Sequence, residues 1–82
     1  MVYVLFIENS WVNEEYSDVI DVFNNEQDAQ RALQQEKTEF FSALDKEDYP
    51  DLDITDNTNH FQCLDENMGN NFELWVFEKE LK

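Results

Sequence analysis

The sequence predicts an α+β fold in which a four-stranded, mainly antiparallel sheet carries one long helix on one face. Three observations support this class. The chain begins with a run of β-branched and aromatic residues, its centre has apolar residues at helical spacing, and its end has two apolar runs around a glycine turn. With 82 residues, the chain is predicted to form a single domain over 1–82 with the element order β-β-α-β-β.

The first half of the predicted sheet is a hairpin. Residues 2–8 (VYVLFIE) contain no strand breaker, and both alternating sets of side chains are apolar. A strand that is apolar on both sides usually lies in the middle of a sheet. Residues 9–15 are mostly polar and are predicted to connect this strand to a second one over residues 16–23.

A long amphipathic helix is predicted at about 25–44. Asn24 is a suitable N-cap, and Gln27 then stands at the capping-box position. Acids in the first turn suit the positive end of the helix dipole. The apolar residues recur at helical spacing and predict the buried side: Ala29, Ala32, Leu33, Phe40, Phe41 and Leu44.

The remaining residues predict an acidic connection and a second hairpin. Residues 45–59 hold six acids, and Pro50 prevents the helix from continuing. Residues 60–66 and 72–80 are predicted as the third and fourth strands, with Gly69 in the turn between them. The first and fourth strands are the most apolar and are therefore expected at the centre of the sheet.

One helix can cover only one face of the predicted sheet. One apolar set of the first strand, together with Trp75 and Phe77 or their neighbours on the fourth, would then have no helix above it. Exposed apolar patches of this kind usually mark interaction sites. We therefore expect that the acidic connection folds over this face, that the protein dimerises, or that a partner binds there.

Charge is the most unusual property of the sequence. Twenty acids and five bases give a net charge of −15, with no base before Arg31 and none between Glu47 and Glu78. Concentrating like charge in a folded domain costs stability through self-repulsion. Such a surface would repel nucleic acid and anionic membranes, so it suits either solubility or a basic protein partner.

No catalytic or targeting motif is recognised. The single cysteine, Cys63, cannot form an internal disulfide, which suggests the cytoplasm of a host cell. Residues 1–7 are apolar but too short to span a membrane, and they lack a basic signal-peptide region. His60 and Cys63 would point to opposite faces of a strand, so they cannot act as base and nucleophile. We expect a protein that is not an enzyme and binds no cofactor.

The sequence matches no complete metal-binding motif. Asp51, Asp53 and Thr55 match the first ligand positions of an EF-hand loop, but Asp56 replaces its glycine and Gln62 its bidentate glutamate. No specific calcium site is therefore predicted, although weak calcium binding over 51–62 is left open. A zinc site at His60 and Cys63 would lack a second pair of ligands.

Mimicry of DNA is the function that the acids suggest. Duplex DNA carries a phosphate every ~3.4 Å of axis per strand, and the offset around the helix increases the true separation. Alternate residues of a strand lie ~6.6–6.8 Å apart on one face, a distance that the separation of neighbouring phosphates can approach. Carboxylates on a strand could therefore occupy positions that phosphates occupy on DNA. Asp65 and Glu66 on the third predicted strand are further acids that could face a basic partner. The candidate partner-binding residues are acids of the first hairpin and of the acidic connection, with two aromatic anchors: Glu14, Glu15, Asp18, Asp21, Asp45, Glu47, Asp48, Asp51, Asp53, Asp56, Trp11 and Tyr49.

In size, acidity and predicted element order, the chain resembles small DNA-mimic inhibitors of phages and mobile elements, of the anti-CRISPR and anti-restriction type. This resemblance covers composition and the whole-chain pattern and involves no motif. It implies a partner such as a CRISPR effector nuclease, whose basic nucleic-acid site would be blocked. The alternative is a small adaptor or homodimerising domain that uses an exposed aromatic sheet face. In either case an acidic run can also be an ordinary solvated face.

Overall fold

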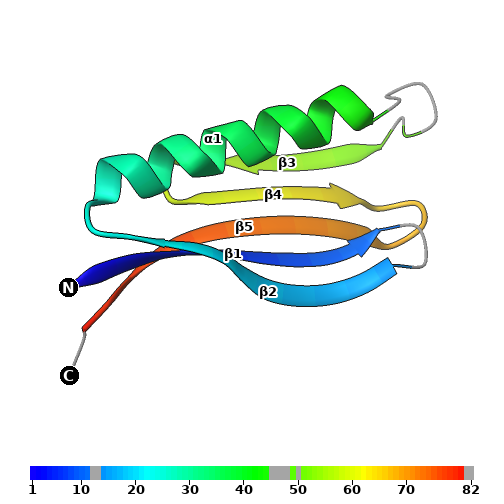
Figure 1. The fold of residues 1–82 in the computed structure, drawn as a ribbon. Helices are drawn as coiled ribbons and strands as arrows, with labels where there is room; N and C mark the ends of the chain where they lie inside the picture. Colours follow the sequence, from blue (N-terminus) through cyan, green and yellow to red (C-terminus); the bar gives the residue numbers. More distant parts are fainter. Residues whose placement is uncertain (12–13, 45–48, 50, 81–82) are drawn as a thin grey trace.

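The protein is described by a computed structural model over residues 1–11, 14–44, 49 and 51–80. A five-stranded antiparallel sheet has the strand order β2-β1-β5-β4-β3, and one helix lies on one of its faces (Figure 1). The predicted α+β class is confirmed. The elements are β1 (Val2–Trp11), β2 (Glu14–Phe23), α1 (Glu26–Ala43), β3 (Leu52–Asp56), β4 (His60–Asp65) and β5 (Asn70–Lys79).

The prediction of four strands was wrong, because β3 lies within the segment predicted as an acidic connection. β3 is a short edge strand that pairs with β4, with Ile54 opposite Cys63. Leu52 is partly buried and packs against the core. Aspartate is disfavoured in strands, so the alternation of Leu52 and Ile54 with acids did not stand out in the sequence. Pairing with β4 provides the stabilisation that the local sequence lacks.

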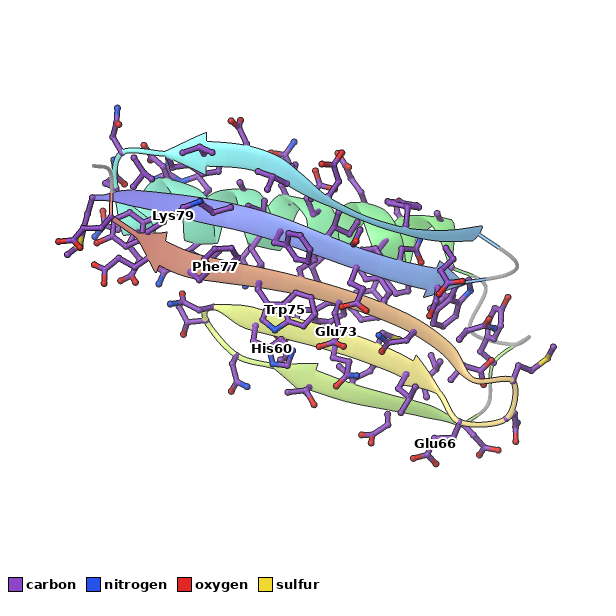
Figure 2. All side chains as sticks on the ribbon, turned by 90° about the horizontal axis from the view of Figure 1, so that it is seen from below. His60, Glu66, Glu73, Trp75, Phe77 and Lys79 are labelled. Atoms are coloured by element: carbon purple, nitrogen blue, oxygen red, sulfur yellow. The ribbon has the colours of Figure 1, made fainter. Side chains whose placement is uncertain are left out.

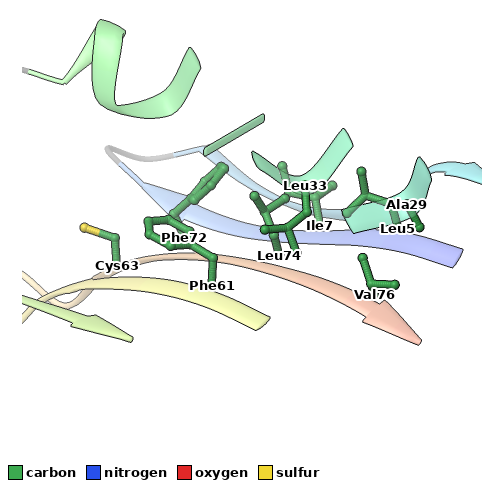
Figure 3. Packing of buried hydrophobic residues seen from close by; sticks show 9 residues of the cluster. All are labelled: Leu5, Ile7, Ala29, Leu33, Phe61, Cys63, Phe72, Leu74 and Val76. Atoms are coloured by element: carbon green, nitrogen blue, oxygen red, sulfur yellow. The ribbon is translucent and has the colours of Figure 1, made fainter. Parts of the chain in front are cut away.

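The core lies between α1 and the strands β1, β5 and β4. As predicted, the first and last strands are neighbours, and Ile7 of β1 lies opposite Leu74 of β5. Ala29 and Leu33 of α1 are fully buried against these strands (Figure 3). Successive side chains of a strand point to opposite faces, so this packing defines a covered face on the helix side and an open face on the other.

The helix begins one residue later than predicted. Asn25 is the N-cap, and its Oδ1 accepts a hydrogen bond of 2.9 Å from the backbone N–H of Asp28. The Asn25 amide also donates to the Asp28 carboxylate at 2.9 Å. The prediction of Asn24 as cap, with Gln27 completing a capping box, was therefore wrong. Two adjacent asparagines offer the same capping group, and the later start brings the Asp28 carboxylate within reach of the cap.

The turn between β4 and β5 contains the predicted left-handed glycine. Gly69 has a φ of 72°, and its N–H donates to the Asp65 carbonyl at 2.8 Å. The Asp65 carboxylate accepts hydrogen bonds from the Asn67 backbone and the Asn70 amide. Asp65 is only 1% exposed, so considering it as a partner-facing acid was wrong. Its carboxylate holds the turn together instead.

Candidate protein-binding surfaces

The edge strand β2 places two aspartates in line because it contains a bulge. Asp18 lies opposite Ile7 and Asp21 opposite Leu5, while Ile20 has no opposite residue on β1. Residues three apart in a regular strand face opposite ways, and the extra residue returns Asp21 to the face of Asp18. Since Ile7 and Leu5 are two positions apart, the spacing along the strand is about 6.6–6.8 Å.

Both aspartates are exposed, and each carboxylate is oriented by the backbone. The N–H of Val19 donates to Asp18 Oδ1 at 2.8 Å, and the N–H of Val22 donates to Asp21 Oδ1 at 2.8 Å. They lie on the covered face of the sheet, but at its edge, where α1 does not bury them. We call Asp18 and Asp21 the carboxylate pair. One oxygen of each side chain is engaged locally, and the other is available to a partner.

The other predicted acids do not form such a row. Asp53 lies opposite Leu64 and Asp56 opposite Phe61, so without a bulge they face opposite sides of the sheet. Asp56 is bonded to Lys37 at 2.9 Å, whereas Asp51 and Asp53 are exposed. Glu15 is exposed on the open face, opposite Ser10. Outside the described residues lie Asp45, Glu47, Asp48 and the side chain of Glu14.

The two predicted aromatic anchors lie together near the end of α1. The ring of Trp11 is 5.1 Å from that of Tyr49 and 5.4 Å from that of Phe40, centroid to centroid. Phe40 in turn stacks on Phe72 at 4.1 Å. Trp11 and Tyr49 are partly buried, and Trp11 packs against the core. They therefore extend the core toward the surface, and their role as anchors remains a prediction.

The open face divides into an apolar half and a polar half. The sequence predicted that either Trp75 and Phe77 or their neighbours on the last strand would lie uncovered by the helix, and the structure places Trp75 and Phe77 on the open face (Figure 2). The strand register places Phe77 beside Val4 and Val22, and Trp75 beside Phe6 and Val19. Several of these side chains are close to half exposed, up to 50% for Val22. The apolar half consists of Val4, Phe6, Val19, Val22, Trp75 and Phe77.

Aromatic contacts make the apolar half continuous across the strands. The ring of Phe6 lies 5.8 Å from that of Trp75 and 6.4 Å from that of Phe77. On β4, the His60 ring stacks on Trp75 at 5.5 Å with an interplanar angle of 11°. Val4 is only 5% exposed because Val22 and Phe77 flank it. The apolar half lies on β2, β1 and β5, and the stacked ring of His60 extends this surface to β4.

The polar half begins with two glutamates on neighbouring strands. Glu8 of β1 lies directly opposite Glu73 of β5. Glu73 is held in place, with Oε1 accepting from the Asn71 amide at 3.1 Å and Oε2 lying 2.8 Å from His60 Nε2. The Gln62 amide donates to Asn71 and continues this chain of hydrogen bonds. Glu8 is exposed beside the fixed carboxylate of Glu73.

Local contacts raise the pKa of two residues, Tyr3 and Glu36. A hydrogen bond to Glu78, whose carboxylate accepts from the Tyr3 hydroxyl at 3.2 Å, raises the pKa of Tyr3, and partial burial adds to the effect. Burial raises the pKa of Glu36 on α1, and the neighbouring charge of Glu39 raises it further. Both shifts have the direction expected where a further negative charge is unfavourable.

The described residues contain neither a metal-binding cluster nor a membrane-spanning helix. Among them, no group of three or more acids, histidines and cysteines is arranged to hold a metal ion. His60 lies on the open face and Cys63 is buried on the covered face, as their spacing predicted. Within the same ranges, no helix is long and apolar enough to cross a membrane.

Comparisons of this chain with protein-family models, with curated proteins and with solved structures found no significant match. Sequence reasoning selected Asp18, Asp21, Trp75 and Phe77 but missed the pairing of Glu8 with Glu73. The two glutamates occupy matching positions, two residues beyond Phe6 and two before Trp75, and this symmetry was the available signal.

Proposed function

We propose that this chain is a binding protein that inhibits a nucleic-acid-binding host-defence enzyme by presenting carboxylates to its basic nucleic-acid site. The anti-CRISPR type of inhibitor is the closest functional analogy, and it implies action in the cytoplasm of the host cell. The observation that carries the proposal is the carboxylate pair. Asp18 and Asp21 are exposed, oriented by backbone N–H groups, and spaced on one face by the bulge.

This geometry suits mimicry because the charges are fixed before binding. A partner that evolved to bind phosphates presents Lys and Arg side chains at defined positions. Carboxylates that are already oriented lose less conformational entropy when they meet those side chains than freely rotating ones would. The net charge of −15 would also accelerate encounter with a basic surface, and this steering weakens as salt increases.

The test is competition with labelled duplex DNA for purified basic nucleic-acid-binding enzymes, including CRISPR effector nucleases, over a range of NaCl concentrations. We expect the protein to displace DNA from at least one enzyme, with an affinity that falls as salt rises. The double substitution D18N/D21N should weaken displacement by at least about tenfold, equivalent to about 1.4 kcal/mol. Asparagine retains the oxygen that accepts the backbone hydrogen bond, so the strand should be preserved.

The matched control is the double substitution E66Q/E80Q, which removes two exposed charges elsewhere. It should weaken displacement by less than about twofold, because it changes only the long-range field. Equal losses for the two double variants, or an affinity that does not change with salt, would refute the proposed mimicry. If the protein displaces DNA from none of the enzymes in the panel, this result would also count against the proposed mimicry.

A second candidate function is that of an interaction domain, either an adaptor or a homodimer, that binds through the open face. The exposure of Phe77, at 44%, beside Val22, at 50%, favours it. In this case substitution of Phe77 should affect binding more than substitution of Asp18 or Asp21. The two candidates therefore differ in which surface of the same protein contacts the partner.

A further inference from the structure

The apolar half of the open face has the dimensions of one helix. Neighbouring strands are ~4.7–4.9 Å apart, so the four strands from β2 to β4 span about 14 Å. An α-helix rises ~1.5 Å per residue and is ~10–12 Å wide with its side chains. About three helical turns would therefore cover Val19, Phe6, Trp75 and the edge of His60. On the opposite face, α1 already packs on β1 and β5.

The glutamates beside the apolar half specify the charge of the occupant. Like charges directly opposite each other in a sheet are destabilising, and Glu8 lies opposite Glu73. The Glu73 carboxylate is held by Asn71 and His60, so it cannot turn away from Glu8 without losing those bonds. A lysine or arginine placed between the two carboxylates would relieve this repulsion. The binding surface therefore combines an apolar area with a cation position at one border.

A second copy of this chain is a poor occupant for the same reason. Each copy carries a net charge of −15, and the open face holds Glu8, Glu15, Asp53 and Glu73. Among the described residues, Lys79 supplies positive charge on that face, and it lies at the far end of the apolar half. If two such faces came into contact, each copy would contribute several carboxylates but only Lys79 as a described cation, so the contact would be repulsive. The charge balance favours a basic partner.

We propose that the apolar half binds one amphipathic helix of a partner protein, whose apolar residues contact Phe6, Trp75 and Phe77 and whose lysine or arginine contacts Glu8 and Glu73. This inference rests on the proposed function in one respect, because the occupant is a segment of a basic partner. It does not depend on the carboxylate pair, which lies on the other face of the sheet. The two proposals can therefore fail separately.

The probe is a synthetic amphipathic helix of about 18 residues, or five turns, made of leucine and lysine. A second peptide with glutamate in place of lysine serves as the charge control. Each is titrated into isotope-labelled protein, and amide chemical shifts are recorded by NMR. The basic peptide should shift the amides of β1 and β5 around Phe6 and Trp75, and the acidic peptide should cause no saturable shift.

Single substitutions locate the contact. Glu8→Gln should weaken binding of the basic peptide about fivefold, because a desolvated ion pair is lost. Glu66→Gln removes one charge at the β4–β5 turn, away from the apolar half, and should weaken it by less than about twofold (Figure 2). Phe77→Ser should weaken binding by at least about tenfold through loss of apolar contact. Val22→Ser, at an exposed position, replaces Phe77→Ser if the latter loses the native spectrum.

Three results would overturn the proposal. Equal effects of Glu8→Gln and Glu66→Gln would show that the peptide responds only to overall charge. Shifts confined to β2 around Asp18 and Asp21 would place the peptide on the carboxylate pair instead. A concentration-dependent dimer in sedimentation, dissociated by Phe77→Ser, would show that a second copy occupies the face. Loss of DNA displacement in D18N/D21N with peptide binding retained would support both proposals as separate properties.

Discussion

Carboxylates that look alike in the sequence have quite different surroundings in the folded protein. Asp65 is buried and accepts two hydrogen bonds within a turn, whereas Asp56 is bonded to Lys37. Asp18 is exposed and oriented by a backbone N–H. Glu36 is partly buried on the helix near a second acid. The contribution of an acid to binding or to stability is therefore set by its neighbours.

Glu36 gives a prediction about pH. Burial and Glu39 raise the pKa of Glu36, so the folded protein holds this proton more tightly than the unfolded chain. The associated stability is present below the unfolded pKa and is lost as pH rises through the folded pKa. Near pH 7, Glu36→Gln should raise the free energy of unfolding by about 0.2–0.5 kcal/mol, the size of a like-charge helix pair.

Urea unfolding of the wild type and of Glu36→Gln at about pH 7 and about pH 3.5 measures this effect. The gain should disappear at the lower pH, where the glutamate is protonated in both states. Glu66→Gln, at an exposed turn position, is the control for removal of one charge and should give a smaller gain near pH 7. A gain of equal size at both pH values would contradict the assigned cause.

Among the elements, a side-chain hydrogen bond sets where the helix begins, and a bulge sets which residues of β2 share a face. Asn25 caps α1 and fixes its first turn through Asp28. The bulge at Ile20 changes which β2 residues share a face, so that Val19 and Val22 both join the apolar half. The same irregularity therefore arranges the carboxylate pair on one face and the apolar half on the other.

The position of the cap can be tested with two adjacent asparagines. Asn25→Ala should lower the free energy of unfolding by about 1 kcal/mol, because the Asp28 N–H loses its side-chain acceptor. Asn24→Ala is the matched control at an exposed neighbouring position and should change it by less than about 0.5 kcal/mol. Chemical denaturation followed by circular dichroism measures both. A larger effect at Asn24 would place the helix start at the residue that the sequence suggested.

For the whole molecule, charge and shape act together. The protein is elongated, with extents of 44 × 20 × 17 Å, and it carries a net charge of −15. Most parts of this surface lie within ~30 Å of one another, which is the screening length at 0.01 M salt. Self-repulsion should therefore act across the domain at low ionic strength and should be reduced near 0.15 M, where the screening length is ~8 Å.

Stability should consequently increase with salt. We expect the urea midpoint to rise when NaCl is raised from about 0.01 M to about 0.15 M, because screening weakens repulsion between acids in the folded state. Choline chloride at the same ionic strength should produce the same rise, since screening does not depend on the identity of the cation. An unchanged midpoint, or a rise produced by sodium alone, would contradict this explanation.

Local patterns in the amino-acid sequence were enough to predict the α+β class, the central position of the most apolar strands, the amphipathic helix and the excess of negative charge. These follow from local periodicity and composition, which do not depend on distant contacts. It also indicated that one helix would leave one sheet face uncovered, with either Trp75 and Phe77 or their neighbours on it. The acidic β3 strand could not be recognised, because Leu52 and Ile54 acquire their strand conformation by pairing with β4.

The combination of residues in each binding surface depends on contacts between strands that are distant in the sequence. Register between strands places Glu8 opposite Glu73, and the β2 bulge brings Asp18 and Asp21 to one face. A shift of one residue in register would move each of these side chains to the other side of the sheet. Register depends on the burial of Leu5, Ile7 and Leu74 beneath α1, which is a property of the whole core and cannot be read from any single segment.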